Sequence, residues 1–263
     1  MKIKDFKYNK EDIITTDRYL EFCKNNNICY IKTDYFITGS LMWRNKLHPD
    51  YINRKIVTGH SDFSITDNIA EKFDTILCTN RSTDNKNVYG IPLGITNDCQ
   101  DGSDHYICGN QDMMVKVSNE TIEKKNLLYL NFRVSTYSEE RQVVFDKFAN
   151  EEFVKTGETI FTLEARKRFL REIKSSKFIL CPRGNGIDTH RTWEALYMGS
   201  IPIIKYENAH HLFTDLPILF IKEWSEICEG SLNQKYEEMI NKDWNMDKLK
   251  ISFWQNFIKK QLE

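Results

Sequence analysis

Short apolar runs recur along the first part of the chain, and polar or amphipathic segments separate them. They predict buried strands at residues 28–33, 55–58, 75–79 and 89–93. Their spacing of about twenty residues suits short crossover connections in a small doubly wound parallel sheet. A helix is predicted at 17–25, before the first strand, and the polar stretch 98–109 predicts a surface loop.

The second half of the chain repeats this alternation. Strands are predicted at 127–132, 152–155, 178–181, 201–204 and 217–221. Helices are predicted at 139–150 and 163–174, with one or two more across 234–262, and a helix near 113–125 leads from one series to the other. The pattern therefore predicts an α/β fold with two Rossmann-like lobes that face each other across a cleft. We expect lobes at residues 1–120 and 121–245, with the helix in 246–263 packing back on the first lobe.

Residues 177–206, KFILCPRGNGIDTHRTWEALYMGSIPIIKY, hold the densest set of structural signals. Pro182 ends a buried strand, and the glycines at 184 and 186 allow a turn. Asp188 or Thr189 can cap the helix that follows, and Gly199 is expected to end it before the next strand.

The first turn of that helix carries His190 and Arg191, where the helix dipole is already positive. A cation there costs roughly 0.3 to 1 kcal/mol, and a bound anion would reverse the sign. A phosphate on the backbone N–H groups, with Arg183 and Arg191 on either side, gives a nucleotide-diphosphate pocket. Alternatively, Arg191 pairs only with Asp188 or Glu194 at helical spacing.

Other polar residues are predicted at the same edge of the second sheet. Arg133 lies in a short polar turn after a predicted strand, and Arg141 lies near the start of the next helix, where it either joins the cluster or decorates an exposed face. Glu194 lies deeper in the helix that starts near Asp188, so it can bind a ribose diol or form a salt bridge with Arg191.

The first lobe offers a candidate general base in the loop His60-Ser61-Asp62, directly after a strand. Either His60 or Asp62 can take a proton from an acceptor hydroxyl, and Asp67 and Asp34 are weaker candidates. The alternative is that the aspartates only cap turns.

Charge and cysteine content narrow the function classes. The chain has 263 residues, with 37 basic and 38 acidic side chains, so no whole-molecule field attracts nucleic acid or an anionic membrane. Seven scattered cysteines indicate reduced thiols and a cytoplasmic location rather than a disulfide framework. No signal peptide and no membrane-spanning run is expected.

Several signatures are missing from the sequence. It contains no GxxxxGK[ST] motif and no GxGxxG motif, which disfavours P-loop NTPases and hydride-transfer enzymes. It contains no DxD motif, which many nucleotide-sugar enzymes use to hold a divalent metal. Cys99, His105 and Cys108 lack an obvious fourth ligand, so we expect no metal site.

The run SKFILCPRGNGIDTHRTWEALYMGSIPII resembles the nucleotide-sugar-binding segment of exostosin-like glycosyltransferases, including short forms encoded by large DNA viruses. The segments IVTGHSDFSIT with IPLGI, and LLYLNFRVSTYSEER, resemble the same family. The resemblance implies the two-lobed GT-B fold, a UDP-sugar donor, inversion at the anomeric carbon and no metal or other cofactor. UDP-xylose is the preferred donor because short relatives include xylosyltransferases, and the chain is too short to resemble a polymerising two-activity exostosin. For a viral protein, the location would be the host cytoplasm.

With this resemblance, the expected donor-binding residues are Asn131, Arg133, Arg183, Gly184, Asn185, Gly186, Asp188, His190, Arg191 and Glu194. Asp62 or His60 is expected to be the catalytic base. The expected partners are a nucleotide-sugar donor and a glycan or glycoprotein acceptor. Two alternatives stay open: a GDP-sugar enzyme of the fucosyltransferase kind, and a non-catalytic nucleotide- or sugar-binding module.

Overall fold

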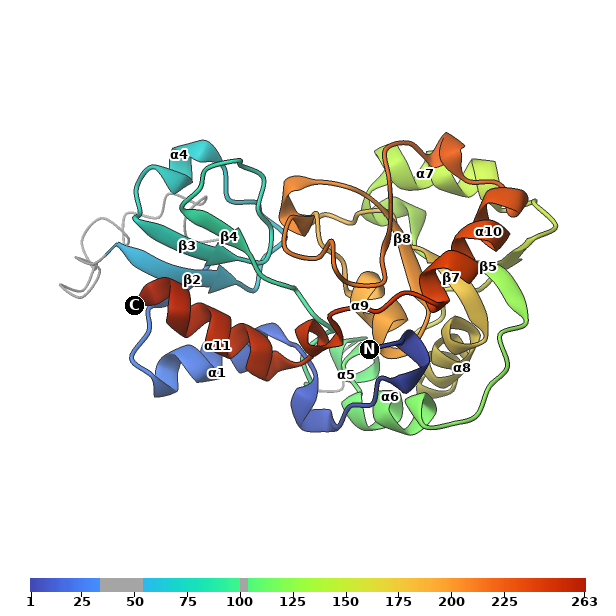
Figure 1. The fold of residues 1–263 in the computed structure, drawn as a ribbon, viewed down its shortest axis with the longest axis horizontal. Coiled ribbons are helices and arrows are strands. Elements are labelled where there is room, and N and C mark those ends of the chain that lie inside the picture. Colours follow the sequence, from blue (N-terminus) through green and yellow to red (C-terminus); the bar gives the residue numbers. More distant parts are fainter. Residues whose placement is uncertain (34–53, 100–103) are drawn as a thin grey trace.

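The computed structural model describes residues 1–33, 54–99 and 104–263, and it places two parallel sheets side by side (Figure 1). The first sheet has the order β1 (Tyr30–Lys32), β2 (Lys55–Gly59), β3 (Thr75–Cys78), β4 (Val88–Gly90). The second has the order β6 (Val154–Thr156), β5 (Asn126–Leu130), β7 (Ser176–Leu180), β8 (Ile201–Lys205), β9 (Leu219–Ile221).

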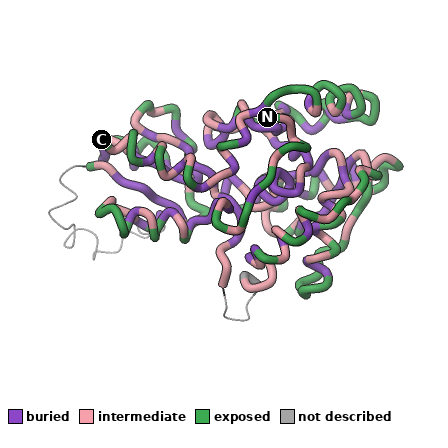
Figure 2. The backbone as a smooth tube through the Cα atoms, turned by 60° about the horizontal axis from the view of Figure 1, so that its bottom comes forward, coloured by how far each residue is buried: buried purple, intermediate pink, exposed green. Residues whose placement is uncertain are grey.

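Helices cover both sheets. They are α1 (Thr16–Asn25), α4 (Asp67–Ala70), α5 (Asp104–Cys108), α6 (Gln111–Ser118), α7 (Ser138–Phe148), α8 (Leu163–Lys174), α9 (His190–Tyr197), α10 (Glu229–Ile240) and α11 (Ile251–Leu262). Short 3-10 turns lie at Ile3–Asp5, Lys10–Asp12, Val134–Thr136, Asn208–His210, Trp224–Glu226 and Met246–Leu249. Figure 2 shows buried backbone running through the middle of the molecule and exposed residues mainly on the outer coils.

The strands of the first sheet are apolar on both faces, as a sheet covered by helices on both sides requires. In β2, Val57 belongs to the large core that continues into the second lobe, and Ile56 belongs to a smaller core beside α4. In β3, Leu77 belongs to the large core and Ile76 to the smaller one. This alternation explains why the strands read as continuous apolar runs in the sequence.

The second sheet contains the point where the strand order changes direction. From β5 the chain passes through α7 to β6 on one side, and then through α8 to β7 on the other side of β5. In open α/β sheets, ligands bind outside the carboxyl ends of the strands at such a point. The ends of β5 and β7 therefore mark the expected site.

Helix α9 ends where the sequence predicted. Gly199 has φ +69° and donates its N–H to Leu196 O, while the N–H of Ser200 bonds to Ala195 O. This pair of bonds is a Schellman motif, and glycine adopts its left-handed residue without strain.

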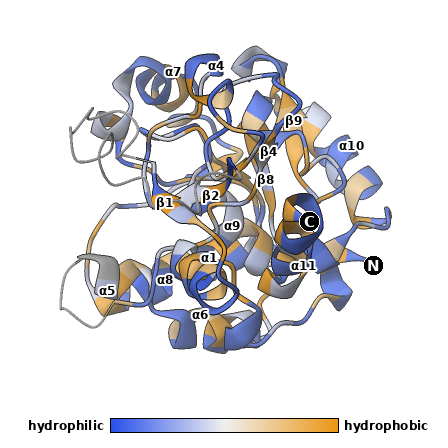
Figure 3. Ribbon diagram, turned by 90° about the vertical axis from the view of Figure 1, so that its left-hand side faces the viewer, coloured by the Kyte–Doolittle hydropathy of each residue, from blue (hydrophilic) through white to orange (hydrophobic). Residues whose placement is uncertain are grey.

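The last helix returns to the first lobe. Helix α11 packs beside α1 and against β2 and β3, as Figures 1 and 3 show. Lys55 Nζ donates to Leu262 O at 2.7 Å, and the rings of Tyr89 and Phe257 meet edge to face at 5.8 Å. The chain therefore crosses between the lobes more than once, which fixes their relative position.

The prediction of an α/β fold with two Rossmann-like lobes is confirmed. Each predicted strand is present, with ends that differ by a few residues. The loop predicted at 98–109 was wrong in part, because its end forms α5, which packs against α8. The helix predicted at 113–125 is shorter and earlier, at Gln111–Ser118.

Candidate active site

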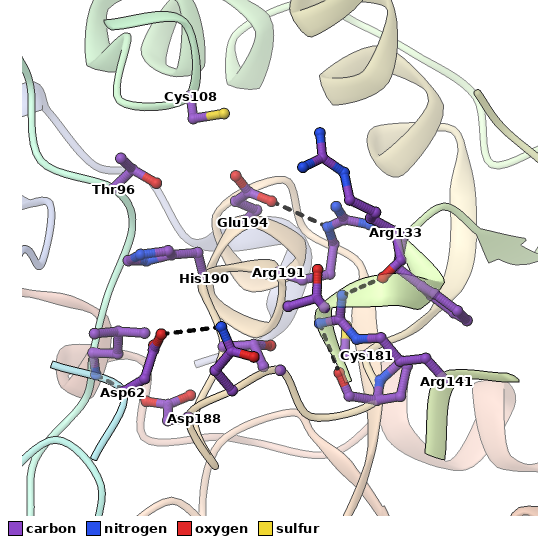
Figure 4. Close-up of a pocket in the computed structure, with 18 of the residues that line it drawn as sticks. Asp62, Thr96, Cys108, Arg133, Arg141, Cys181, Asp188, His190, Arg191 and Glu194 are labelled. Carbon is purple, nitrogen blue, oxygen red and sulfur yellow. Dashed lines mark hydrogen bonds and ion pairs between the residues drawn. The ribbon is translucent and has the colours of Figure 1, made fainter. Parts of the chain in front are cut away.

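A cavity of about 890 Å³ lies between the two lobes. The loops after β2 and β4 line it on the first-lobe side, and the loops after β5 and β7, with α8 and α9, line it on the other (Figure 4). Because these are the carboxyl ends of parallel strands, the cavity occupies the ligand position of an open α/β sheet.

The N-terminus of α9 opens into this cavity without a cap. Thr189 is the N-cap residue, but its side chain makes no capping hydrogen bond, and the first turn carries no acidic residue. The first N–H groups of a helix have no partner within the helix, so they can bind an anion. The positive first turn noted in the sequence therefore faces the cavity.

Two arginines hold the carboxylate of Glu194 inside α9. Arg166 Nη1 lies 2.7 Å from Glu194 Oε1, and Arg191 Nε lies 3.3 Å from Glu194 Oε2. Burial raises the pKa of Glu194, but Arg166 and Arg191 outweigh it, so the pKa is lowered and the carboxylate stays ionised. The salt bridge with Arg191, left open as an alternative, is present.

This cluster still has unused donors. Arg191 Nη1 and Arg166 Nε are buried, and neither has a hydrogen-bond partner in the part of the chain that the structure describes. Buried polar atoms are rarely left without a partner, so the cluster is not fully satisfied by its own contacts. The Arg191 side chain is 22% exposed and lines the cavity, so its accessible part can contact a ligand there. Arg191 also stacks on Phe169, with 4.5 Å from its guanidinium carbon to the ring centre.

Arg133 follows β5 and lines the same cavity. Its guanidinium lies over the ring of Phe161, 4.8 Å from the ring centre, and Phe161 is 38% exposed. A cation and an aromatic face at the rim can bind a phosphate and a planar or sugar ring respectively.

Two of the predicted donor-binding residues do not line the cavity. Arg183 points to the other side of its turn, where it covers the ring of Tyr137 at 4.7 Å and lies 3.6 Å from Glu207. Asn131 is buried and donates to Tyr129 OH at 3.1 Å and to Glu158 O at 2.9 Å. Both side chains make local contacts and do not line the cavity in this structure, so their donor-binding role stays a prediction.

Arg141 is buried, so the alternative that it lies on an exposed helix face is wrong. Its guanidinium donates to Arg183 O at 2.8 Å, to Arg133 O at 3.0 Å and to Pro182 O at 3.4 Å. Arg141 therefore fastens the turn after β5 to the turn after β7, and it shapes the cavity wall (Figure 4).

Asp188 joins the two lobes instead of capping α9. Its carboxylate accepts hydrogen bonds from Leu93 N in the first lobe at 2.8 Å and from Trp193 Nε1 at 2.9 Å. Asn80 strengthens the junction, because its side-chain oxygen accepts from Asp188 N at 3.0 Å. Burial raises the pKa of Asp188 to about 7. A Cβ at Gly186 would lie 3.0 Å from the side chain of Asn80, so a larger residue here would require Asn80 to shift.

Both residues predicted as the base line the cavity, but they differ in their free atoms. His60 has both ring nitrogens bonded, with Tyr30 OH 2.7 Å from Nδ1 and Asp17 Oδ1 2.7 Å from Nε2. Asp62 accepts from Asn185 Nδ2 at 3.3 Å. Asp62 therefore has acceptor capacity left, whereas His60 has none.

His190 points from α9 toward the first-lobe side of the cavity, where Asp62 and Thr96 lie (Figure 4). Its Nδ1 lies 2.8 Å from Gly94 O, an acceptor, so Nδ1 carries the proton in the neutral ring. Burial lowers the pKa of His190 below its ordinary value. The neutral ring then presents Nε2 as an acceptor.

Asp67 and Asp34 were the weaker candidates for the general base. The hydroxyl of Thr83 donates to Asp67, away from the cavity, and Asp34 lies outside the described residues. Among the residues that the structure describes, no group of three potential metal ligands occurs, and no helix is long and apolar enough to cross a membrane.

Arg166 is the main site residue that sequence reasoning missed. It lies in the basic helix α8, where Arg168 and Arg171 suggest a solvated face. Its spacing to Leu170 and Ile173, both buried, would have placed it on the inner face at i, i+4 and i+7.

Two α/β lobes enclose a cavity, and an uncapped helix N-terminus and an arginine cluster lie beside it at the switch point of the second sheet. The family match identifies the class as a glycosyltransferase. Residues 113–263 match the family model described as the RXYLT1 C-terminal domain, which is more than half of the chain. The chain belongs to this family, and the likeness to exostosin-like enzymes is supported at the level of a glycosyltransferase.

Among solved structures, the chain is similar to an alpha1,3-fucosyltransferase, with 16% identity over 81% of this chain and 73% of that one and a TM-score of 0.45. A comparison with curated proteins gives no match.

Proposed function

We propose that this protein transfers a sugar from a nucleotide-diphosphate sugar to a hydroxyl of a glycan or glycoprotein acceptor. UDP is the proposed nucleotide and xylose the preferred sugar, on the basis of the family and the motif resemblance. Inversion at the anomeric carbon and independence of metal ions belong to the same proposal, as does a reducing, cytoplasmic location for a chain with seven scattered cysteines.

The observation that carries the proposal is the cavity-lining, partly exposed guanidinium of Arg191 beside the uncapped N-terminus of α9. A diphosphate has several anionic oxygens, so it can accept from Arg191 and from the helix N–H groups at once. Arg133 can neutralise the same group from the end of β5.

Positive charge at this position favours the departure of the nucleotide. When the bond between the anomeric carbon and the phosphate oxygen breaks, negative charge grows on the leaving diphosphate. Fixed cations and N–H dipoles around that oxygen stabilise the transition state more than the ground state. The same arrangement can supply what a divalent metal supplies in other enzymes.

The acceptor would enter from the first-lobe side. Phe63 lies at that rim, next to Asp62, and is 48% exposed. An exposed aromatic face beside a carboxylate offers an apolar platform for a sugar ring and a hydrogen-bond acceptor for its hydroxyls. We therefore propose the acceptor subsite at Phe63 and Asp62, with the donor on the α9 side.

Release of UDP from a panel of UDP-sugars tests the function, with and without EDTA. We expect release that depends on an acceptor and that persists in EDTA. The Arg191→Ala variant should bind UDP at least about tenfold more weakly, because it loses a charge-assisted contact. The Arg168→Ala variant is the matched control, since Arg168 is exposed on α8 and does not line the cavity.

Stabilisation by GDP but not by UDP in a thermal-shift titration would contradict the donor assignment and indicate a GDP-sugar enzyme. Binding without any release over the whole panel would indicate a non-catalytic module.

A further inference from the structure

Among the described residues that line the cavity, His190 is the one whose ring has a fixed tautomer and an unused acceptor. The Nδ1–H group is held by Gly94 O at 2.8 Å, and no described residue hydrogen-bonds Nε2. Only glycine fits at position 94, because φ is +72° and a Cβ there would lie 2.1 Å from Ile14 O. The backbone of the first lobe therefore orients an imidazole that belongs to the second.

The direction of the ring places Nε2 where the two substrates would meet. His190 is the first residue of α9, so its backbone lies beside the proposed diphosphate. Its side chain crosses to the side of Asp62, where the proposed acceptor would bind (Figure 4). In an in-line attack, the acceptor hydroxyl approaches the anomeric carbon from the side opposite the diphosphate. A general base is therefore needed between the anion site and the acceptor site.

We propose that His190 Nε2 is the general base that takes the proton from the acceptor hydroxyl, an inference that rests on the proposed function. The acceptor oxygen forms a bond to the anomeric carbon as the bond from that carbon to the phosphate oxygen breaks. The electron pair of the broken bond leaves with the diphosphate, and the hydroxyl proton moves to Nε2. The proton passes to solvent when the product departs.

The charges around His190 suit this role. Burial lowers the pKa of His190, and Arg166 lowers it further, whereas the hydrogen bond to Gly94 O and the carboxylates of Glu194 and Asp62 raise it. Burial dominates, so the ring is neutral before reaction and able to accept a proton. Asp62 then stabilises the imidazolium and orients the acceptor. An imidazole also has an ordinary pKa nearer to neutral pH than a carboxylate, which suits a general base.

The substitution His190→Asn tests the role of Nε2 separately from that of Nδ1. The Asn side-chain N–H can reach Gly94 O as Nδ1–H does, but nothing replaces Nε2. We expect kcat to fall by about 100-fold or more, since general base catalysis contributes roughly that much. The affinity for UDP should stay within about threefold, because the base does not touch the nucleotide.

The pH dependence provides a readout that a structural role would not change. In the wild type, kcat should fall toward acid as His190 becomes protonated, and this limb should be absent from His190→Asn. The Asp62→Asn variant should keep the limb, shifted to lower pH, because a carboxylate that favours the imidazolium has been removed. His190→Gln is the second variant, used with thermal unfolding to show that the fold is retained.

A wild-type kcat in folded His190→Asn and His190→Gln would overturn this assignment and leave the glycosyltransferase function intact. An acid limb that disappears only in Asp62→Asn would overturn it as well and make Asp62 the base. If the wild type releases no nucleotide from any nucleotide sugar, the proposed function fails, and the base assignment fails with it.

Discussion

Replacing Arg141 with Met should destabilise the protein and disorganise the cavity wall. Arg141 is 9% exposed and donates to three backbone carbonyls, at 2.8, 3.0 and 3.4 Å. Methionine fills much of the same volume but donates nothing, so the carbonyls of Arg133, Pro182 and Arg183 lose their partner.

The expected loss follows from those three contacts. A buried acceptor without a partner costs about 1–3 kcal/mol, and bonds from a charged donor lie at the upper end. The carbonyls lie beside a cavity that can admit water, and removal of a buried charge restores part of the desolvation cost. We therefore expect the free energy of unfolding to fall by about 3 kcal/mol.

Urea unfolding, extrapolated linearly to water, measures this change. The Arg168→Met variant on α8 is the control, and a change within about 0.5 kcal/mol is expected because its side chain is exposed. UDP affinity should fall in Arg141→Met, because the turns that carry Arg133 and Gly184 are no longer tied together. A loss below about 1 kcal/mol with unchanged UDP affinity would refute the idea that Arg141 organises the site.

Three further predictions concern other parts of the cavity. Burial raises the pKa of Asp188 to about 7, so between about pH 4 and 7 the folded protein holds a proton that the unfolded chain has lost. Its free energy of unfolding should therefore fall as pH rises through this window, by at most about 1.4 kcal/mol per unit, and urea titrations of Asp188→Asn should lack this contribution. Glu194→Gln should destabilise by about 3–5 kcal/mol in the same assay, because it leaves the buried Arg166 and the partly buried Arg191 without their carboxylate; a loss under about 1 kcal/mol would contradict this pairing. Phe63→Ala should raise KM for the acceptor without changing the affinity for UDP or the melting temperature, and an unchanged KM would place the acceptor elsewhere.

Much of the fold was predictable from the sequence. Period and composition located the strands, because parallel strands covered on both faces read as apolar runs, as Ile56 and Val57 show. The end of α9 was predictable as well, because only the local backbone decides that a glycine fits the left-handed position. These features depend on residues close in sequence.

The direction of side chains in the site was less predictable. Arg141 in α7 and Arg183 in the turn after β7 lie near the same sheet edge, yet Arg141 is buried against carbonyls and Arg183 faces Tyr137 and Glu207. Arg166 was overlooked because its partner Glu194 is 28 residues away in the chain. Such pairs form only when two helices pack against each other, so no local sequence pattern predicts them.

By itself, the sequence determined the two parallel sheets, the positive first turn of α9 and the family to which the chain belongs. The tertiary structure decided which charges meet: Glu194 between two arginines, Asp188 across the lobe junction, and His190 held by Gly94. The physical reason is range. Strand and helix signals act over a few residues, whereas ion pairs and buried hydrogen bonds need atoms that only packing brings within about 3 Å.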